Sequence, residues 1–127
     1  MQNFRKLKVW IRANALAPKV RNLTDGFPKT GYRSLREQVI DAMESIPFNI
    51  AEGCGASSPK EFARFLEIAI KSSNEVDAEL QLALDYGIVA DREALSIADE
   101  VIQIRMMLTA LRKRVLSEQS KRSSRRE

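Results

Sequence analysis

The sequence predicts an all-α fold, an antiparallel up-down four-helix bundle over residues 1–117 of the 127-residue chain. Three observations support this fold class. Apolar residues recur at steps of three and four along four long stretches, which places them on one face of a helix. The chain has only five Gly and four Pro, whereas a fold of many short strands requires frequent turn formers. The breaks between the stretches are short, so consecutive helices should run antiparallel.

The first two helices are expected over residues 4–24 and 33–52. Each contains a proline, Pro18 and Pro47, which should kink the helix or remove a backbone hydrogen bond. Gly53 is well placed as the residue that follows the end of the second helix. The apolar positions that predict these helices are Val9, Ala13, Leu16, Val20 and Leu23 in the first, and Leu35, Val39, Ala42, Ile46 and Ile50 in the second.

The third helix, expected over residues 59–86, has the clearest start signal in the chain. Ser58 can cap it, a proline follows at the first helical position, and Glu61 completes a capping box. The fourth helix is expected over residues 91–117. Residues 118–127 are polar and basic, and we expect them to be disordered. The apolar faces comprise Phe62, Phe65, Leu66, Ala69, Val76, Leu80 and Leu84 in the third helix, and Ala94, Ile97, Val101, Ile104, Leu108, Leu111 and Val115 in the fourth.

The composition argues against most enzymatic and metal-dependent functions. The chain contains no His, which removes imidazole-ligated zinc and haem sites and Ser–His or Cys–His nucleophilic pairs. Its single cysteine, Cys54, cannot form an internal disulfide. Most of the carboxylates of the second and third helices are expected on solvated faces; they are Glu37, Asp41, Glu44, Glu75, Asp77 and Glu79. We therefore expect no catalytic residue, no metal and no cofactor.

The chain is expected to be cytoplasmic and not to engage a membrane. No apolar run approaches the roughly 20 residues that span a bilayer, and the N-terminal residues lack the apolar core of a signal peptide.

An unusual polar group is predicted where the second helix ends. Asn49 and Glu52 stand three residues apart among apolar neighbours. With Gln38 and Ser72 they could form a buried polar cluster between the second and third helices. Such clusters fix the register of packed helices when they are fully hydrogen-bonded. We favour this structural role over a ligand site, which is the alternative.

The same stretch carries a resemblance to a known family. The sequence Asn49-Ile50-Ala51-Glu52-Gly53 and its flanks resemble the four-helix bundle proteins encoded in intervening sequences of bacterial 23S ribosomal RNA genes. Further matching residues are Phe4, Leu7, Val9, Trp10, Phe27-Pro28, Leu35, Gln38, Ser45-Ile46, Glu61-Phe62, Phe65-Leu66, Ala69, Ser72 and Glu75.

This resemblance implies a left-handed up-down bundle, often a homopentamer with a central channel. It also implies kinship with the accessory protein of diversity-generating retroelements, a basic barrel that binds nucleic acid and a reverse transcriptase. The family usually has basic residues after the glutamine, whereas this chain has Val39-Ile40-Asp41. A nucleic-acid contact is therefore not expected on the second helix.

The charge is unevenly distributed along the chain. Residues 1–24 carry a net charge of +6, residues 105–127 carry +6 and residues 25–104 carry −8. Because the first and fourth helices are neighbours in an up-down bundle, these basic segments should share one face, which is an electrostatic footprint for RNA or DNA. Loss of the chain after Ser117 should weaken binding less than charge reversal within this face. The candidate contacts are Arg5, Lys8, Arg12, Arg112, Arg114, Arg122 and Arg126.

Surplus apolar residues predict self-association. The residues that fall outside the predicted core faces are Phe4, Leu7, Trp10 and Ile11 in the first helix, and Leu95, Ala98, Ile102 and Met106 in the fourth. Together with the resemblance, they predict a homo-oligomer, most simply a pentamer. Three hypotheses on function remain: a non-enzymatic nucleic-acid-binding or scaffold protein, a structural oligomer or protein-interaction adaptor whose basic side meets the acidic side of the next subunit, and an enzyme.

Overall fold

The computed structural model describes residues 2–126 of the chain. It contains four α-helices, preceded by a short 3-10 helix, and no strand occurs within this range. The predicted all-α four-helix bundle is therefore confirmed. The elements are η1 (Phe4–Lys6), α1 (Lys8–Asp25), α2 (Arg33–Cys54), α3 (Pro59–Asp85) and α4 (Asp91–Arg126).

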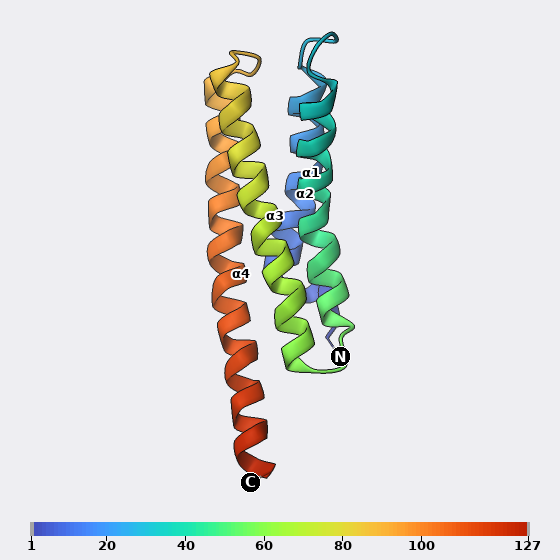
Figure 1. The fold of residues 1–127 in the computed structure, drawn as a ribbon, viewed down its shortest axis with the longest axis vertical. Coiled ribbons are helices and arrows are strands. Elements are labelled where there is room, and N and C mark those ends of the chain that lie inside the picture. The colour runs from blue at the N-terminus through green and yellow to red at the C-terminus, as the bar shows by residue number, and fades with distance from the viewer. Residues whose placement is uncertain (1, 127) are drawn as a thin grey trace.

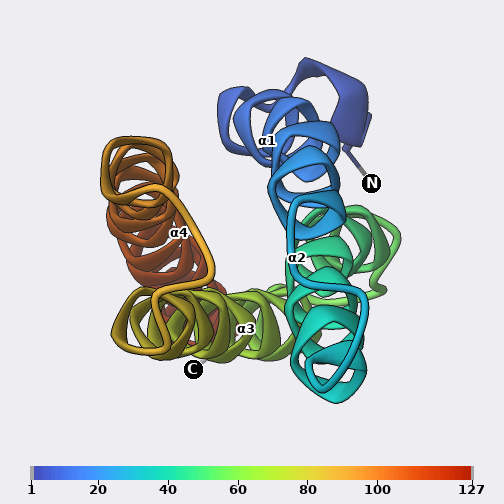
Figure 2. The same cartoon turned by 90° about the horizontal axis from the view of Figure 1, so that it is seen from above.

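The helices run alternately up and down, and each lies beside the next one in the chain (Figure 1). Seen along the bundle, α1 lies diagonally opposite α3, and α2 lies opposite α4 (Figure 2). The two ends of the bundle differ. We call the end with the α1–α2 and α3–α4 connections the loop end. The other end, with the α2–α3 connection and the N-terminal residues, is the turn end.

A continuous apolar core receives side chains from all four helices. Full burial of a large aliphatic side chain contributes about 1.5–3 kcal/mol, so this core is the main source of stability. α3 packs extensively against α2 and α4, whereas α1 packs more lightly against both of its neighbours. The largest fully buried apolar side chains are Met43, Ile46, Ile50, Leu66, Leu80, Ile104, Leu108, Val20, Val39, Val76 and Val101.

Local signals account for the start of α3 and the course of the first two helices. The Ser58 hydroxyl accepts a hydrogen bond from the Glu61 backbone N–H at 3.2 Å, as a capping residue does. α1 and α2 continue through Pro18 and Pro47 without a break in the helix.

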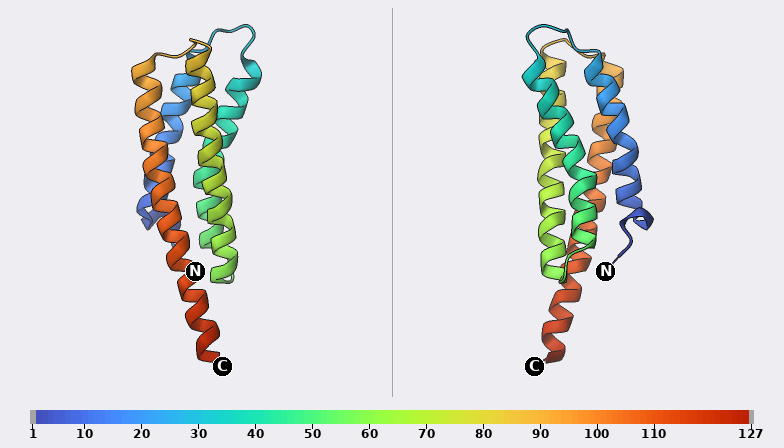
Figure 3. Two further views of the ribbon diagram at one scale, coloured as in Figure 1. Left: turned by 60° about the vertical axis from the view of Figure 1, so that its left-hand side comes forward. Right: turned by 90° about the vertical axis from the view of Figure 1, so that its right-hand side faces the viewer.

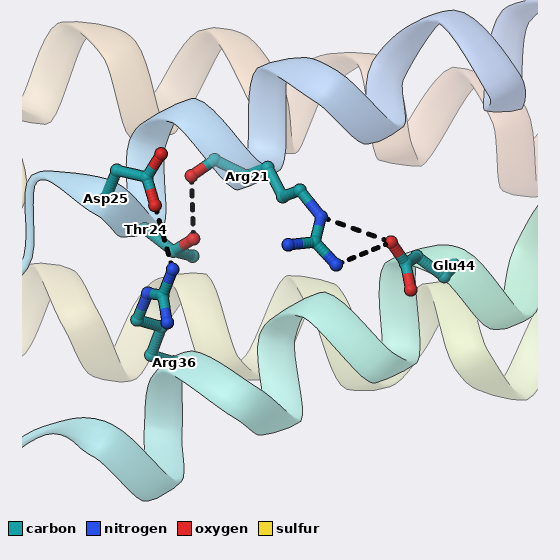
Figure 4. Close-up of polar contacts among 5 residues, drawn as sticks. All are labelled: Arg21, Thr24, Asp25, Arg36 and Glu44. Atoms are coloured by element: carbon teal, nitrogen blue, oxygen red, sulfur yellow. Dashed lines mark hydrogen bonds and ion pairs between the residues drawn. The ribbon is translucent and has the colours of Figure 1, made fainter.

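Polar contacts fasten the loop-end half of α1 to α2 (Figure 4). The Arg21 guanidinium lies 3.2 Å from the Glu44 carboxylate, and Arg36 lies 2.8 Å from Asp25. The buried Thr24 hydroxyl donates a hydrogen bond to the Arg21 carbonyl at 2.8 Å. These exposed ion pairs supplement the light apolar packing of α1, and each contributes at most about 1 kcal/mol.

Gly53 does not follow the end of α2, as the sequence had indicated, but lies inside this helix. A Cβ atom added at Gly53 would lie 2.7 Å from Cδ1 of Phe62 and 3.1 Å from Cβ of Phe65. The glycine therefore allows α3 to approach α2 closely, which is a tertiary requirement and not a left-handed helix end.

α4 also differs from its predicted bounds, because it continues beyond residue 117 to Arg126. No Gly or Pro occurs between residues 117 and 126, and Lys, Arg, Glu and Gln are good helix formers, so no local signal ends the helix. The expectation that residues 118–127 are disordered in solution stays a prediction.

Candidate nucleic-acid interface

Three of the predicted contacts, Arg5, Lys8 and Arg114, are exposed near the turn end. Arg5 lies in η1 and Lys8 begins α1, while Arg114 lines a groove at this end together with Pro59. None of the three forms an ion pair with another residue that the structure describes. Their charges are therefore available to an anionic partner.

Arg12 is instead engaged by an acid of the bundle. Its guanidinium donates hydrogen bonds to both carboxylate oxygens of Glu100, from Nε at 3.0 Å and from Nη2 at 2.5 Å. These hydrogen bonds raise the pKa of Arg12 and lower the pKa of Glu100. Bidentate pairing uses the fork of donors that would bind a phosphate. Arg12 therefore joins α1 to α4, and its role as a nucleic-acid contact stays a prediction.

Arg112 also pairs with an acid of the bundle, and its role as a nucleic-acid contact likewise stays a prediction. Its Nη2 lies 3.6 Å from the Glu67 carboxylate of α3, and its Nε is buried without a hydrogen-bond partner. The pairing of Arg12 and Arg112 within the bundle has one physical reason. Both point toward an acid on an adjacent helix, which a count of charges along the sequence does not show.

The side chains of Arg122 and Arg126 lie outside the described residues, although the backbone at both positions is helical. Within the same basic segment, Lys113 and Lys121 are exposed. Sequence reasoning did not select these two lysines, because no motif separates them from their basic neighbours.

The aromatic residues near these cations are not free to stack on bases. The rings of Phe4 and Trp10 meet edge to face with their centroids 5.0 Å apart, and both residues are half-buried. The Arg5 guanidinium lies 4.5 Å from the centroid of the Phe4 ring, within the range of a cation–π contact.

The charge is segregated along the bundle more clearly than around it. The turn-end half, residues 2–15, 44–72 and 106–126, contains 14 Lys or Arg and 5 Asp or Glu. The loop-end half, residues 16–43 and 73–105, contains 7 Lys or Arg and 11 Asp or Glu. Because exposed charges are screened beyond about 10 Å, a polyanion would be attracted to the turn end and not to the whole α1–α4 face.

The predicted polar cluster forms only in part, and Ser45 is its centre. The Asn49 amide donates to the Ser45 carbonyl at 2.8 Å and to the Ser45 hydroxyl at 2.9 Å. The buried Ser72 hydroxyl donates to the same hydroxyl at 2.8 Å and so joins α3 to α2. Gln38 bonds to a neighbouring serine of α2, and Glu52 is exposed, so neither belongs to the cluster.

A second polar group on α2 and α3 was not predicted. Glu79 is half-buried beside Asp41 and Glu75 in a groove that Gln38 also lines, and its Oε1 is buried without a hydrogen-bond partner. Burial, followed by the two neighbouring carboxylates, raises the pKa of Glu79 to about 7. Glu79 is therefore an exception to the expectation that most of these carboxylates lie on solvated faces. The only signal of this polar group in the sequence was the spacing of Glu75 and Glu79 along one helix.

The structure offers little for catalysis or metal binding. Among residues 2–126, no group of three or more His, Cys, Asp or Glu side chains is arranged to hold a metal ion. Cys54 is buried, and burial raises the pKa of its thiol, which keeps the thiol protonated and unreactive. In the described part of the chain, no helix combines the length and apolar character that a membrane span needs.

These features define a class of protein: a helical bundle with charge segregated along its axis and with no catalytic signal in its described residues. The chain belongs to the family described as 23S rRNA-intervening sequence protein, whose family model matches residues 5–110. The resemblance seen in the sequence is thus confirmed.

A crystal structure at 1.70 Å resolution of a protein of unknown function is similar in fold. That protein belongs to the S23 ribosomal protein family of Bacteroides thetaiotaomicron VPI-5482. The TM-score is 0.78 at 24% sequence identity, and the match covers 83% of this chain and 98% of that chain. At this identity the likeness shows the fold alone. No curated protein matches the sequence.

Proposed function

We propose that this chain is a non-enzymatic, oligomeric and cytoplasmic protein that binds nucleic acid through the basic residues of α1 and α4. One observation carries the proposal: the turn-end half holds 14 basic residues against 5 acidic ones, and Arg5, Lys8 and Arg114 are exposed there without an internal ion pair. A surplus of this kind attracts the phosphate backbone.

Binding of this type is mainly to phosphates. Lys and Arg that neutralise phosphates release counterions but carry no information about the base sequence. We therefore expect steep salt dependence and little sequence preference. The packing of Trp10 against Phe4 also disfavours base stacking.

An apolar stripe on the outer face of α4 supports the oligomeric part of the proposal. Leu95, Ile102 and Met106 are 54%, 39% and 61% exposed, and they recur at steps of seven and four. A cyclic ring would cover such stripes by identical contacts, and the family resemblance favours five subunits. Light scattering coupled to gel filtration tests this part. A monomer at micromolar concentration would contradict it.

The same stripe also favours a second candidate function, a structural oligomer or adaptor without a nucleic-acid ligand. In that case the stripe would bind another protein chain, and the basic turn end would meet an acidic surface. Nucleic-acid binding therefore has to be tested separately from assembly.

The test is fluorescence anisotropy with a labelled duplex DNA and a structured RNA at about 50 mM and 200 mM salt. We expect binding that weakens at least tenfold over this range, because three or more phosphate contacts would be lost. The variant Arg5→Glu, Lys8→Glu and Arg114→Glu should bind more weakly than the wild-type protein and keep the helical circular dichroism.

A matched variant with three charge reversals at exposed loop-end positions, Lys19→Glu, Lys29→Glu and Arg92→Glu, serves as the control and should retain more of the binding. If the wild-type protein binds neither probe at about 50 mM salt, where phosphate contacts are strong, the adaptor function replaces this one.

A further inference from the structure

The last turns of α4 leave the bundle and form an arm, which we define as residues 117–126 (Figure 3). Glu118 lines the groove at the turn end together with Ser58 and Pro59, where α3 begins. Beyond this level α4 continues past the ends of the other three helices. At 1.5 Å per residue, residues 119–126 extend the helix by about 12 Å.

The arm has the composition of a surface for a polyanion and not for another protein. Leu116 is the last apolar residue of the chain, so the arm has no apolar face to bury against a partner helix. Its charged residues are one acid, Glu118, and four cations, Lys121, Arg122, Arg125 and Arg126.

These four cations are concentrated as densely as the phosphates of a double helix. Positions 121–126 span about 8 Å along a helix axis. A duplex carries one phosphate per roughly 1.7 Å of its axis, or about five over the same length. A single strand presents fewer phosphates over that length, so a duplex is the better match.

The same charge pattern makes the helix of the arm depend on a partner. Lys121 and Arg125, and likewise Arg122 and Arg126, are like charges four residues apart, a spacing that destabilises a helix. Because the arm continues an existing helix, it needs no new nucleus. This repulsion lowers the helix content of the arm, and a bound polyanion would relieve it.

We infer that the arm is the principal phosphate-binding element of this chain, and that contact with a double-stranded nucleic acid stabilises its helix. The inference rests on the proposed function and locates the binding site. It also reverses the expectation that loss of the chain after Ser117 is the milder change. Arg12 and Arg112 are held by Glu100 and Glu67, whereas the sequence of the arm places four cations within six consecutive positions, beyond the ends of the other helices.

Two full-length variants of equal net charge test the position of the site. The arm variant carries Lys121→Gln, Arg122→Gln, Arg125→Gln and Arg126→Gln, since glutamine is also a good helix former. The loop-end variant carries Lys19→Gln, Lys29→Gln, Arg33→Gln and Arg92→Gln, all at exposed positions. Anisotropy titrations use a duplex DNA and a duplex RNA of the same sequence, about 20 base pairs long, across a salt series.

In the arm variant, the slope of log K against log salt should fall by about 3, and affinity at about 100 mM salt should drop more than tenfold. The loop-end variant should stay close to wild type. In the wild-type chain, NMR Cα shifts of residues 117–126 should become more helical when duplex is added. The ratio of the two affinities identifies whether DNA or RNA is the preferred source of phosphates.

Failure of the inference about the arm can be distinguished from failure of the proposed function. If the wild-type protein binds but the arm variant binds equally well, or if both variants lose affinity equally, the inference about the arm is overturned and the proposed function stands. Unchanged shifts of residues 117–126 in a saturated complex also overturn it. If wild-type protein binds neither duplex, the proposed function itself fails.

Discussion

Glu79 should make the stability of the protein fall as pH rises from about 4.5 to about 7. Its pKa is raised from 4.5 to about 7 by burial and by the nearby carboxylates of Glu75 and Asp41. Within this interval the folded state binds more protons than the unfolded state, so the free energy of unfolding decreases with pH. One pKa unit corresponds to about 1.4 kcal/mol, so the full interval corresponds to at most about 3 kcal/mol, and screening by solvent at this half-buried side chain reduces it to roughly 1–2 kcal/mol.

The substitution Glu79→Gln isolates this effect, because glutamine is close in shape to the protonated side chain. The variant should match wild type near pH 4 and exceed its free energy of unfolding by roughly 1–2 kcal/mol at pH 8. Urea denaturation at several pH values measures the difference. Glu93→Gln, at an exposed position of α4, should show no such trend. A difference between Glu79→Gln and wild type that is independent of pH would refute the reasoning.

Four further substitutions test the packing of the helices and the ion pair between Arg12 and Glu100. Asn49→Ala should lower the free energy of unfolding by about 1–3 kcal/mol because the hydrogen bonds of Asn49 are lost, whereas Glu52→Ala should change it by less than about 0.5 kcal/mol. Equal free energies of unfolding for the two variants in urea denaturation would contradict the assignment of Asn49, but not Glu52, to the polar cluster. Gly53→Ala should lower Tm through overpacking of about 1–3 kcal/mol despite a gain in helix propensity, and an unchanged Tm would contradict the close approach of α2 and α3. The lowered pKa of Glu100 means that its pairing with Arg12 stabilises the fold at neutral pH and is lost on acidification. Glu100→Gln should therefore cost about 1 kcal/mol at pH 7 and little at about pH 3 in thermal melts, and an equal cost at both would refute the pairing.

The sequence was sufficient for the helices because their signals are local. Apolar spacing and the Ser58 cap act within one or two turns, and the four predicted helices agree closely with α1 to α4 except at two ends. α1 begins at Lys8 and not at residue 4, because the backbone is extended at Leu7 after η1, and α4 continues beyond residue 117. Position 53 shows the limit of reasoning from local signals. A glycine is required there because Phe62 and Phe65 of α3 pack against it, and the residues around Gly53 in the sequence do not reveal this contact.

The candidate site was less predictable, since availability of a charge depends on its partner in space. Arg12 and Glu100 are 88 residues apart in the chain and meet only in the folded bundle. The burial of Glu79 likewise depends on how closely α2 and α3 pack along one groove. The excess of basic residues was visible in the sequence, but its concentration at one end required the direction of each helix.

The light packing of α1 has a consequence for how the native state opens. Proteins open in cooperative units, and the unit with the fewest buried contacts opens at the lowest free energy. α1 is that unit here, because it packs more lightly than α3 does against its neighbours. Its amide hydrogens should exchange with solvent by a partial unfolding that leaves α2, α3 and α4 assembled. Each such opening would transiently expose the apolar strip that α1 covers and make it available to a neighbouring chain.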